Sequence, residues 1–150
     1  MNTVKHLNGS SLQPLPKKRF TFWSKQYVAC IVFASLLGSY MDLFFVGKQL
    51  YKFPIRPFPE IFPINIVFTL VGLPILVIIF LQSISKVNKW GRAGIILFVS
   101  LLMSIFEKLA EVLGLVVHSA RWEHLYTFLG YMFFLTVISF SHDWFDKGKG

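Results

Sequence analysis

Four apolar blocks, each close to the length of a membrane-spanning helix, dominate this 150-residue chain. A helix rises about 1.5 Å per residue, so about 20 apolar residues are needed to cross the hydrocarbon of a bilayer. Three blocks reach that length, and the last, with about 16 strictly apolar positions, lies at its lower limit. The blocks occupy residues 27–46, 64–84, 93–117 and 125–140.

The composition favours the same class, since 55% of the residues are apolar, 17 are Phe and only 15% are charged. Lipid offers the backbone no water partner, so a spanning segment is a helix or part of a closed barrel, and no block alternates with a two-residue period. The sequence therefore predicts an all-α integral membrane protein, a bundle of four transmembrane helices with short loops. We expect a mobile basic tail with an aromatic collar at 1–26, the membrane domain at 27–142 and a second tail at 143–150.

Orientation follows from the Lys and Arg residues outside these blocks. Ten lie in the N-terminal segment, the second loop and the C-terminal tail, whereas four lie in the first and third loops. The positive-inside rule then predicts cytoplasmic termini, with the first and third loops outside. Membrane lipids are the expected partners of the basic residues, and no nucleic-acid partner is expected.

Three carboxylates fall within the apolar blocks, where an ionisable group is costly and indicates a functional role by default. Asp42 lies about 22 Å along the first block and Glu107 about 21 Å along the third, so both belong to the outer half of the membrane. Glu111 follows one turn later on the same helix face. Lys108 is placed to pair with Glu111 or to extend to the outer interface.

The outer loops bring cations and aromatic residues towards these carboxylates. The predicted polar cluster, a candidate site for a ligand, comprises Asp42, Arg56, Glu107, Glu111, Trp122, His124 and Tyr126. A purely structural alternative has Asp42 and Glu107 holding the bundle together through Arg56, Lys108 or tyrosine hydroxyls.

The first outer loop is rich in proline, with four prolines within ten residues of the segment 51–63. Such a segment cannot form a continuous helix. It is predicted either to lie in the interface as an aromatic connector or to cover the outer mouth with Arg56 directed at a carboxylate. Pro74 is expected to kink the second helix. The pairs Ala34/Gly38 and Ala110/Gly114 favour close helix packing, within the bundle or in a homodimer.

Several kinds of chemistry find little support. A single cysteine, Cys30, leaves no intramolecular disulfide or redox pair. The spacing of His118, Glu123 and His124 matches no standard zinc signature, so no metal or cofactor is expected and His118 is predicted to be a solvated loop histidine. The chain also lacks a recognisable hydrolase motif, and an enzyme is not expected.

The sequence does carry a resemblance. Tyr40-Met41-Asp42-Leu43, the loop pattern Tyr-x-x-Pro-x-Arg-x-x-Pro from Tyr51 to Pro59, Pro74, Glu107, and Trp122 to Phe128 follow one another in order. Over residues 27–140 the chain resembles a family of small multi-spanning membrane proteins of unassigned function from spore-forming Gram-positive bacteria, catalogued under a clostridial locus name. The resemblance implies a bacterial plasma membrane location and marks Asp42, Arg56, Glu107, Trp122 and His124 for testing, but it supplies no reaction.

Three functions remain open at this point. The first is binding of a ligand, a lipid headgroup or a partner protein at the outer face. The second is a proton- or cation-coupled carrier in which Glu107 loads and releases a proton, for which four helices leave little room unless copies assemble. A membrane-embedded hydrolase using Asp42, Glu107 and His124 is the weakest. We favour binding.

Overall fold

The computed structural model describes residues 24–148 and confirms the all-helical fold class. Four α-helices make up most of these residues, with a π-helical turn before the second helix and two short strands in the loops. The elements in order are α1 (Lys25–Gly47), β1 (Tyr51–Lys52), η1 (Phe68–Gly72), α2 (Leu73–Ile84), α3 (Lys89–Val112), β2 (Val117–His118) and α4 (His124–Lys147). The mobile tail and aromatic collar expected before the first helix fall almost wholly on residues 1–23, outside the described residues.

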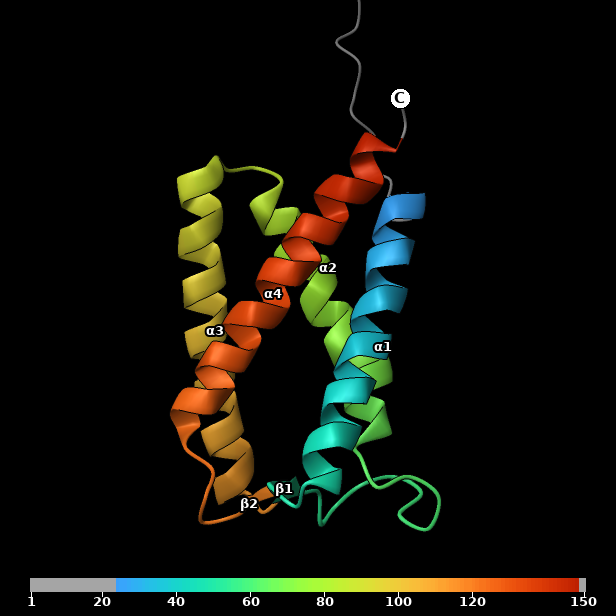
Figure 1. The fold of residues 1–150 in the computed structure, drawn as a ribbon, viewed down its shortest axis with the longest axis vertical. Helices are drawn as coiled ribbons and strands as arrows, with labels where there is room; N and C mark the ends of the chain where they lie inside the picture. Colours follow the sequence, from blue (N-terminus) through green and yellow to red (C-terminus); the bar gives the residue numbers. More distant parts are fainter. Residues whose placement is uncertain (1–23, 149–150) are drawn as a thin grey trace, which may run out of the picture.

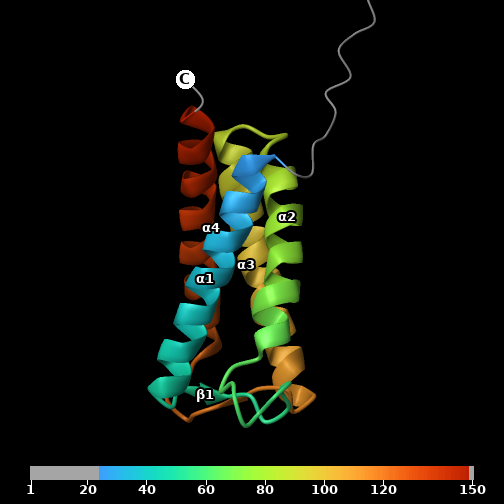
Figure 2. The same cartoon turned by 90° about the vertical axis from the view of Figure 1, so that its right-hand side faces the viewer.

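The helices lie side by side and alternate in direction along the chain (Figure 1 and Figure 2). We call the end that carries β1 and β2 the loop end, and the opposite end, where α1 begins and α4 finishes, the terminal end. Helix α4 packs on α3 and α1, and α2 packs mainly on α1. The first and third loops therefore meet at the loop end.

The core lies where α1, α2 and α4 meet, and its buried side chains are apolar. A Cβ added at Gly38 would overlap the side chain of Leu73, and Ala34 is fully buried, so this pair of small residues brings α1 close to α2. Large apolar side chains cover the outside of the bundle, among them Phe98 and Leu101 on α3. An apolar exterior around a small core is the arrangement that a lipid solvent favours.

The lengths of the helices differ from those expected. Helices α1, α3 and α4 are each long and apolar enough to cross a membrane, whereas the second apolar helix, Phe68–Ile84, is shorter. The sequence predicted that the last helix is the shortest span, but α4 has 24 residues and continues to Lys147. Residues 143–147, expected in a tail, are thus helical.

Contacts at the terminal end explain why α4 is longer. The Arg92 guanidinium donates to the Asp143 carboxylate at 2.7 Å, and the Gln26 amide donates to Asp146 at 2.7 Å. These bonds tie the last turns of α4 to α3 and α1, so polar residues that end the hydropathy signal still continue the helix.

Helix α3 ends at Val112, five residues before the expected end, because of Gly114. This glycine has φ +74°, the left-handed conformation that terminates helices at low cost. The Leu115 N–H donates to the Ala110 carbonyl at 2.9 Å and the Gly114 N–H donates to the Glu111 carbonyl at 3.0 Å, which is the Schellman pattern. Gly114 is a helix terminator, and a Cβ added there would meet nothing within 4 Å, so it does not bring helices together within the bundle.

The π-helical turn η1 immediately precedes Pro74. Proline has no N–H and its ring crowds the preceding turn, so a regular α-helix cannot pass through it undisturbed. Here the Leu73 N–H donates to the Phe68 carbonyl five residues earlier, which widens the turn. The irregularity expected at Pro74 is thus a π turn at the start of α2.

Candidate functional site

The first and third loops are joined by a two-residue antiparallel ladder at the loop end. Tyr51 pairs with His118 and Lys52 with Val117. The Ser119 N–H also donates to the Leu50 carbonyl at 2.8 Å. The ladder brings residues from α1, β1 and the end of α3 into contact.

Tyr51 fixes the first of the predicted carboxylates. Its hydroxyl donates a 2.6 Å hydrogen bond to Asp42, the only hydrogen bond that Asp42 makes with its side chain among the described residues. Burial of the ring, followed by the charge of Asp42, raises the pKa of the Tyr51 hydroxyl far above its ordinary value. The hydroxyl therefore stays protonated and acts as a permanent donor.

Trp122 and His118 fix the second carboxylate. Glu107 accepts a 3.1 Å hydrogen bond from Trp122 Nε1, and His118 Nε2 lies 3.1 Å from the same carboxylate oxygen. The Trp122 N–H is shared with the Thr127 hydroxyl at 3.3 Å. The Glu107 side chain is 17% exposed and that of His118 is 5% exposed, so the contact is largely shielded from solvent.

Glu111 completes a cluster of two carboxylates and two imidazoles. His118 Nδ1 lies 3.4 Å from Glu111, and His124 lies 3.7 Å from Glu107 through Nδ1 and 3.6 Å from Glu111 through Nε2. Lys108 pairs with Glu111 at 2.9 Å, one of the two predicted roles of this lysine. We call Glu107, Glu111, His118 and His124 the Glu–His cluster.

The Glu–His cluster does not have the geometry of a metal site. Each imidazole faces both carboxylates, with one nitrogen towards each, so the donor atoms do not converge on one point. No group of three or more His, Cys, Asp or Glu side chains within residues 24–148 is arranged to hold a metal ion. What the cluster provides is close approach of imidazole nitrogens to carboxylate oxygens, at 3.1–3.7 Å.

Trp122 links the two carboxylates through aromatic contacts. It stacks on His118 with ring centroids 5.4 Å apart and an interplanar angle of 15°. It also meets the edge of Tyr51 at 5.4 Å and that of Tyr126 at 5.7 Å. Asp42, Tyr51, Trp122 and Glu107 therefore form one continuous chain of contacts.

Arg56 makes different contacts from those expected. Its guanidinium donates to the carbonyls of Phe53 at 2.6 Å, Phe62 at 2.8 Å and Pro59 at 3.2 Å. These bonds hold the proline-rich loop in a turn of its own, and the prediction of Arg56 directed at a carboxylate is wrong. A loop with four prolines has few internal N–H donors, so its carbonyls are free to accept from a side chain.

The tip of the proline-rich loop presents apolar side chains to the surroundings. Ile55, Phe58 and Ile61 are 62%, 65% and 70% exposed. We call these three residues the apolar tip.

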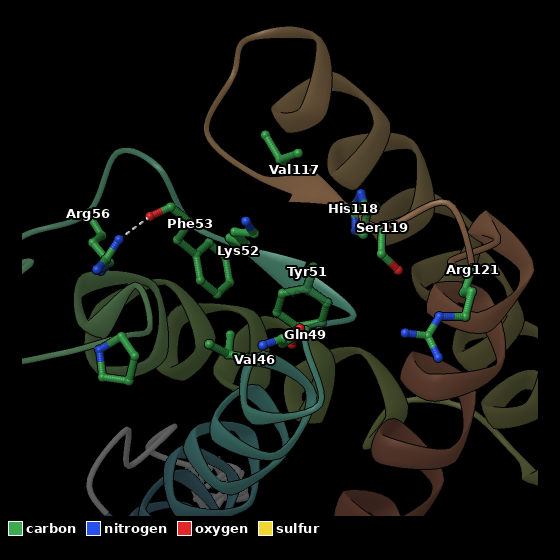
Figure 3. Close-up of a pocket in the computed structure, with 11 residues that line it drawn as sticks. Val46, Gln49, Tyr51, Lys52, Phe53, Arg56, Val117, His118, Ser119 and Arg121 are labelled. Carbon is green, nitrogen blue, oxygen red and sulfur yellow. Dashed lines mark hydrogen bonds between the residues drawn. The ribbon is translucent and has the colours of Figure 1, made fainter.

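A pocket of about 710 Å³ lies between the two loops, beside the carboxylates but not lined by them (Figure 3). Tyr51 and His118 form part of its wall, so the side chains that hold Asp42 and Glu107 also shape the pocket. Figure 3 shows Arg56 and Arg121 at opposite sides. The pocket is also lined by Val46, Gln49, Lys52, Phe53, Pro63, Val117 and Ser119.

The structure brings together most of the predicted cluster but adds residues that sequence reasoning placed elsewhere. Glu107, Glu111, Trp122, His124 and Tyr126 are neighbours, Asp42 joins them through Tyr51, and Arg56 lies apart on the pocket wall. His118, expected to be solvated, is buried between the carboxylates and Trp122. The available local signal was weak: the β-branched residues Val116 and Val117, which favour strands, follow the helix-ending Gly114.

Comparison with family models, with curated proteins and with solved structures found no match to this chain.

Proposed function

We propose that this chain is a four-span protein of a bacterial plasma membrane, with both termini in the cytoplasm and the loop end outside. Three helices of spanning length support a membrane location, and the fourth span would be Phe68–Ile84 together with the apolar residues before it. The orientation rests on the distribution of Lys and Arg. Kinship with the clostridial locus family, carried by the pattern from Tyr51 to Pro59, is part of the proposal.

A labelling experiment tests the orientation. With Cys30 replaced by Ala, a membrane-impermeant maleimide added to intact cells is expected to label Lys52→Cys and not Lys86→Cys. Labelling of Lys86→Cys alone would reverse the orientation.

Within this topology we propose a binding protein whose loop-end pocket takes a small ligand or a lipid headgroup from outside. The observation that carries the proposal is the pocket of about 710 Å³ between two loops joined by a strand ladder. Ligand pockets commonly measure about 300–1,000 Å³.

The carboxylates of Asp42, Glu107 and Glu111 do not line the pocket but hold side chains that form its wall. Tyr51 is bonded to Asp42, and His118 faces Glu107 and Glu111 with its two ring nitrogens, which fixes both side chains in the wall. A wall whose side chains are fixed before binding reduces the entropy lost on binding.

Native mass spectrometry of the chain released from detergent tests the binding function. We expect a bound molecule on the wild type that is lost in Val46→Trp, where the indole fills the pocket. The matched control is Val112→Trp on the exposed surface of α3, which should keep the adduct. Retention of the adduct by Val46→Trp would contradict the proposal.

The carrier remains the second candidate, and the Glu–His cluster is the observation that favours it. Two imidazoles that each reach two carboxylates provide several positions for one proton. In proteoliposomes, Glu107→Gln would abolish proton flux driven by a membrane potential if the chain is a carrier. Equal flux with and without protein excludes it.

A further inference from the structure

We propose that the loop-end pocket binds a phosphate group, carried either by a phospholipid headgroup or by a soluble phosphate ester. The inference rests on the proposed binding function and names the chemical class of its ligand. Three features support it: the charge of the pocket wall, the unpaired donors in that wall and the apolar tip beside it.

The charge of the wall is positive. Lys52, Arg56 and Arg121 contribute cations, and the wall contains no Asp or Glu. Behind the wall, the carboxylate of Asp42 is held by Tyr51, and that of Glu107 is held by Trp122 and His118. A cavity lined by one sign of charge concentrates ions of the opposite sign.

Two of the three cations are free to bind an anion. Lys52 and Arg121 are exposed, come from different loops, and form no side-chain hydrogen bond or ion pair with any residue that the structure describes. Arg56, in contrast, is committed to three loop carbonyls. Arg121 supplies a guanidinium, whose planar arrangement of N–H donors matches phosphate oxygens. Lys52 supplies an ammonium that acts as a point charge.

A neutral donor is also unsatisfied. The Ser119 hydroxyl oxygen is buried and has no hydrogen-bond partner among residues 24–148, and Ser119 lines the pocket next to Arg121 (Figure 3). Because this oxygen has almost no accessible surface, a rotation about χ1 of Ser119 is needed before the hydroxyl can donate to a ligand oxygen in the pocket. Gln49, whose backbone has φ 57°, adds an amide to the pocket lining.

The apolar tip indicates how a lipid would present its phosphate. Phe53, Arg56 and Pro63 line the pocket, and the exposed Ile55, Phe58 and Ile61 belong to the same loop. Apolar side chains at this position rest at the acyl boundary while basic groups lie at headgroup level. The pocket would then open where phospholipid phosphates are concentrated.

Isothermal titration calorimetry on the full chain in a non-ionic detergent tests the inference with two matched pairs of probes. The first pair is glycerol 3-phosphate and glycerol, and the second is dioctanoyl phosphatidic acid and dioctanoylglycerol. In at least one pair we expect the phosphate-bearing probe to bind about 10-fold or more tightly than its neutral counterpart. Phosphatidic acid that binds more tightly than glycerol 3-phosphate identifies a lipid headgroup, and equal affinities identify a soluble ester.

Substitutions place the phosphate within the pocket. Lys52→Ala and Arg121→Ala should each weaken binding about 10-fold, and Ser119→Ala about 3-fold, because each removes one donor. The matched control is Lys48→Ala, which removes the same charge from an exposed lysine outside the pocket and should leave binding unchanged. Equal affinities for the charged and neutral probes, or equal losses in Lys48→Ala and Lys52→Ala, overturn the inference.

Val46→Trp in the same titration separates this inference from the proposed function. If Val46→Trp abolishes binding but the probes show no preference for phosphate, the pocket binds ligands and the phosphate inference is wrong. If phosphate binds as well to Val46→Trp as to the wild type, the pocket is not the site and both proposals fail.

Discussion

Tyr51→Phe removes the hydrogen bond between the first loop and α1 while keeping the ring that meets Trp122. The Tyr51 hydroxyl lies 2.6 Å from Asp42, within the range of about 2.5–2.7 Å for a hydroxyl bound to a carboxylate. Hydrogen bonds to charged groups contribute about 1.5–3 kcal/mol to stability. Interhelical hydrogen bonds in membranes average about 0.6 kcal/mol, because the unfolded chain also finds partners.

We expect the larger value here, because Asp42 has no other side-chain hydrogen bond within the described part of the chain. The free energy of unfolding should fall by about 1.5–3 kcal/mol in Tyr51→Phe. The raised pKa of Tyr51 has a definite consequence for pH dependence. The bond requires the protonated hydroxyl, so it should persist as the pH rises through the ordinary tyrosine range of about 10.

Unfolding in mixed micelles, followed by circular dichroism as a denaturing detergent is added, measures this free energy. A double-mutant cycle with Asp42→Ala isolates the pair, and Tyr51→Phe should cost less than about 0.5 kcal/mol in that background. The control is Tyr40→Phe, where the ring is 63% exposed and the hydroxyl has no partner among the described residues. An equal effect of Tyr51→Phe with and without Asp42 would show that the hydroxyl does not stabilise the fold through Asp42.

Three further predictions concern the backbone and the proline-rich loop. Gly38→Ala should lower the free energy of unfolding by about 1–3 kcal/mol in the same assay, because the added Cβ overlaps the side chain of Leu73. Gly94→Ala, where the added Cβ meets open space, should raise the free energy of unfolding by about 0.5–1 kcal/mol. Gly114→Ala should cost about 1–2 kcal/mol because alanine is strained at φ +74°, and an unchanged stability would contradict the helix-terminating role. Arg56→Lys should expose the loop to limited proteolysis, since an ammonium cannot hold three carbonyls in a fixed fork, while the helical circular dichroism stays unchanged.

The helices were predictable from sequence because lipid imposes one solution on a long apolar segment. The ends of the helices were harder to predict, because hydropathy reflects the composition of a segment, whereas the end of a helix depends on single residues. Leu115, Val116 and Val117 extend the third apolar block, yet Gly114 ends α3 before them. The end of α4, in contrast, was predicted too early. Asp143 and Asp146 lower the hydropathy there, but their bonds to Arg92 and Gln26 extend the helix.

The site depended on contacts that helical spacing cannot predict. Spacing on α3 was sufficient to put Glu107, Lys108 and Glu111 together. Which groups face them was decided by the ladder between Tyr51 and His118, two residues long and 67 positions apart in the chain. A ladder so short leaves no periodic signal, so the sequence left Arg56, Lys108 and tyrosine hydroxyls open as partners of the carboxylates, and the fold uses Tyr51 for Asp42.

The length of the second apolar helix bears on how deep the loop-end pocket lies relative to the lipid headgroups. Its 17 residues, Phe68–Ile84, span about 25 Å, which is about 5 Å less than the hydrocarbon thickness. In the proposed four-span topology, flanking residues or local thinning of the bilayer make up the difference, and the loop that precedes this helix carries the apolar tip. A spin label at Phe58→Cys, with Cys30 replaced by Ala, should therefore collide more with oxygen, which concentrates in lipid, than with a water-soluble nickel chelate. A label at Glu60→Cys in the same loop should show the opposite preference, and equal preferences at the two positions would mean that the loop lies in water and the pocket opens away from the headgroups.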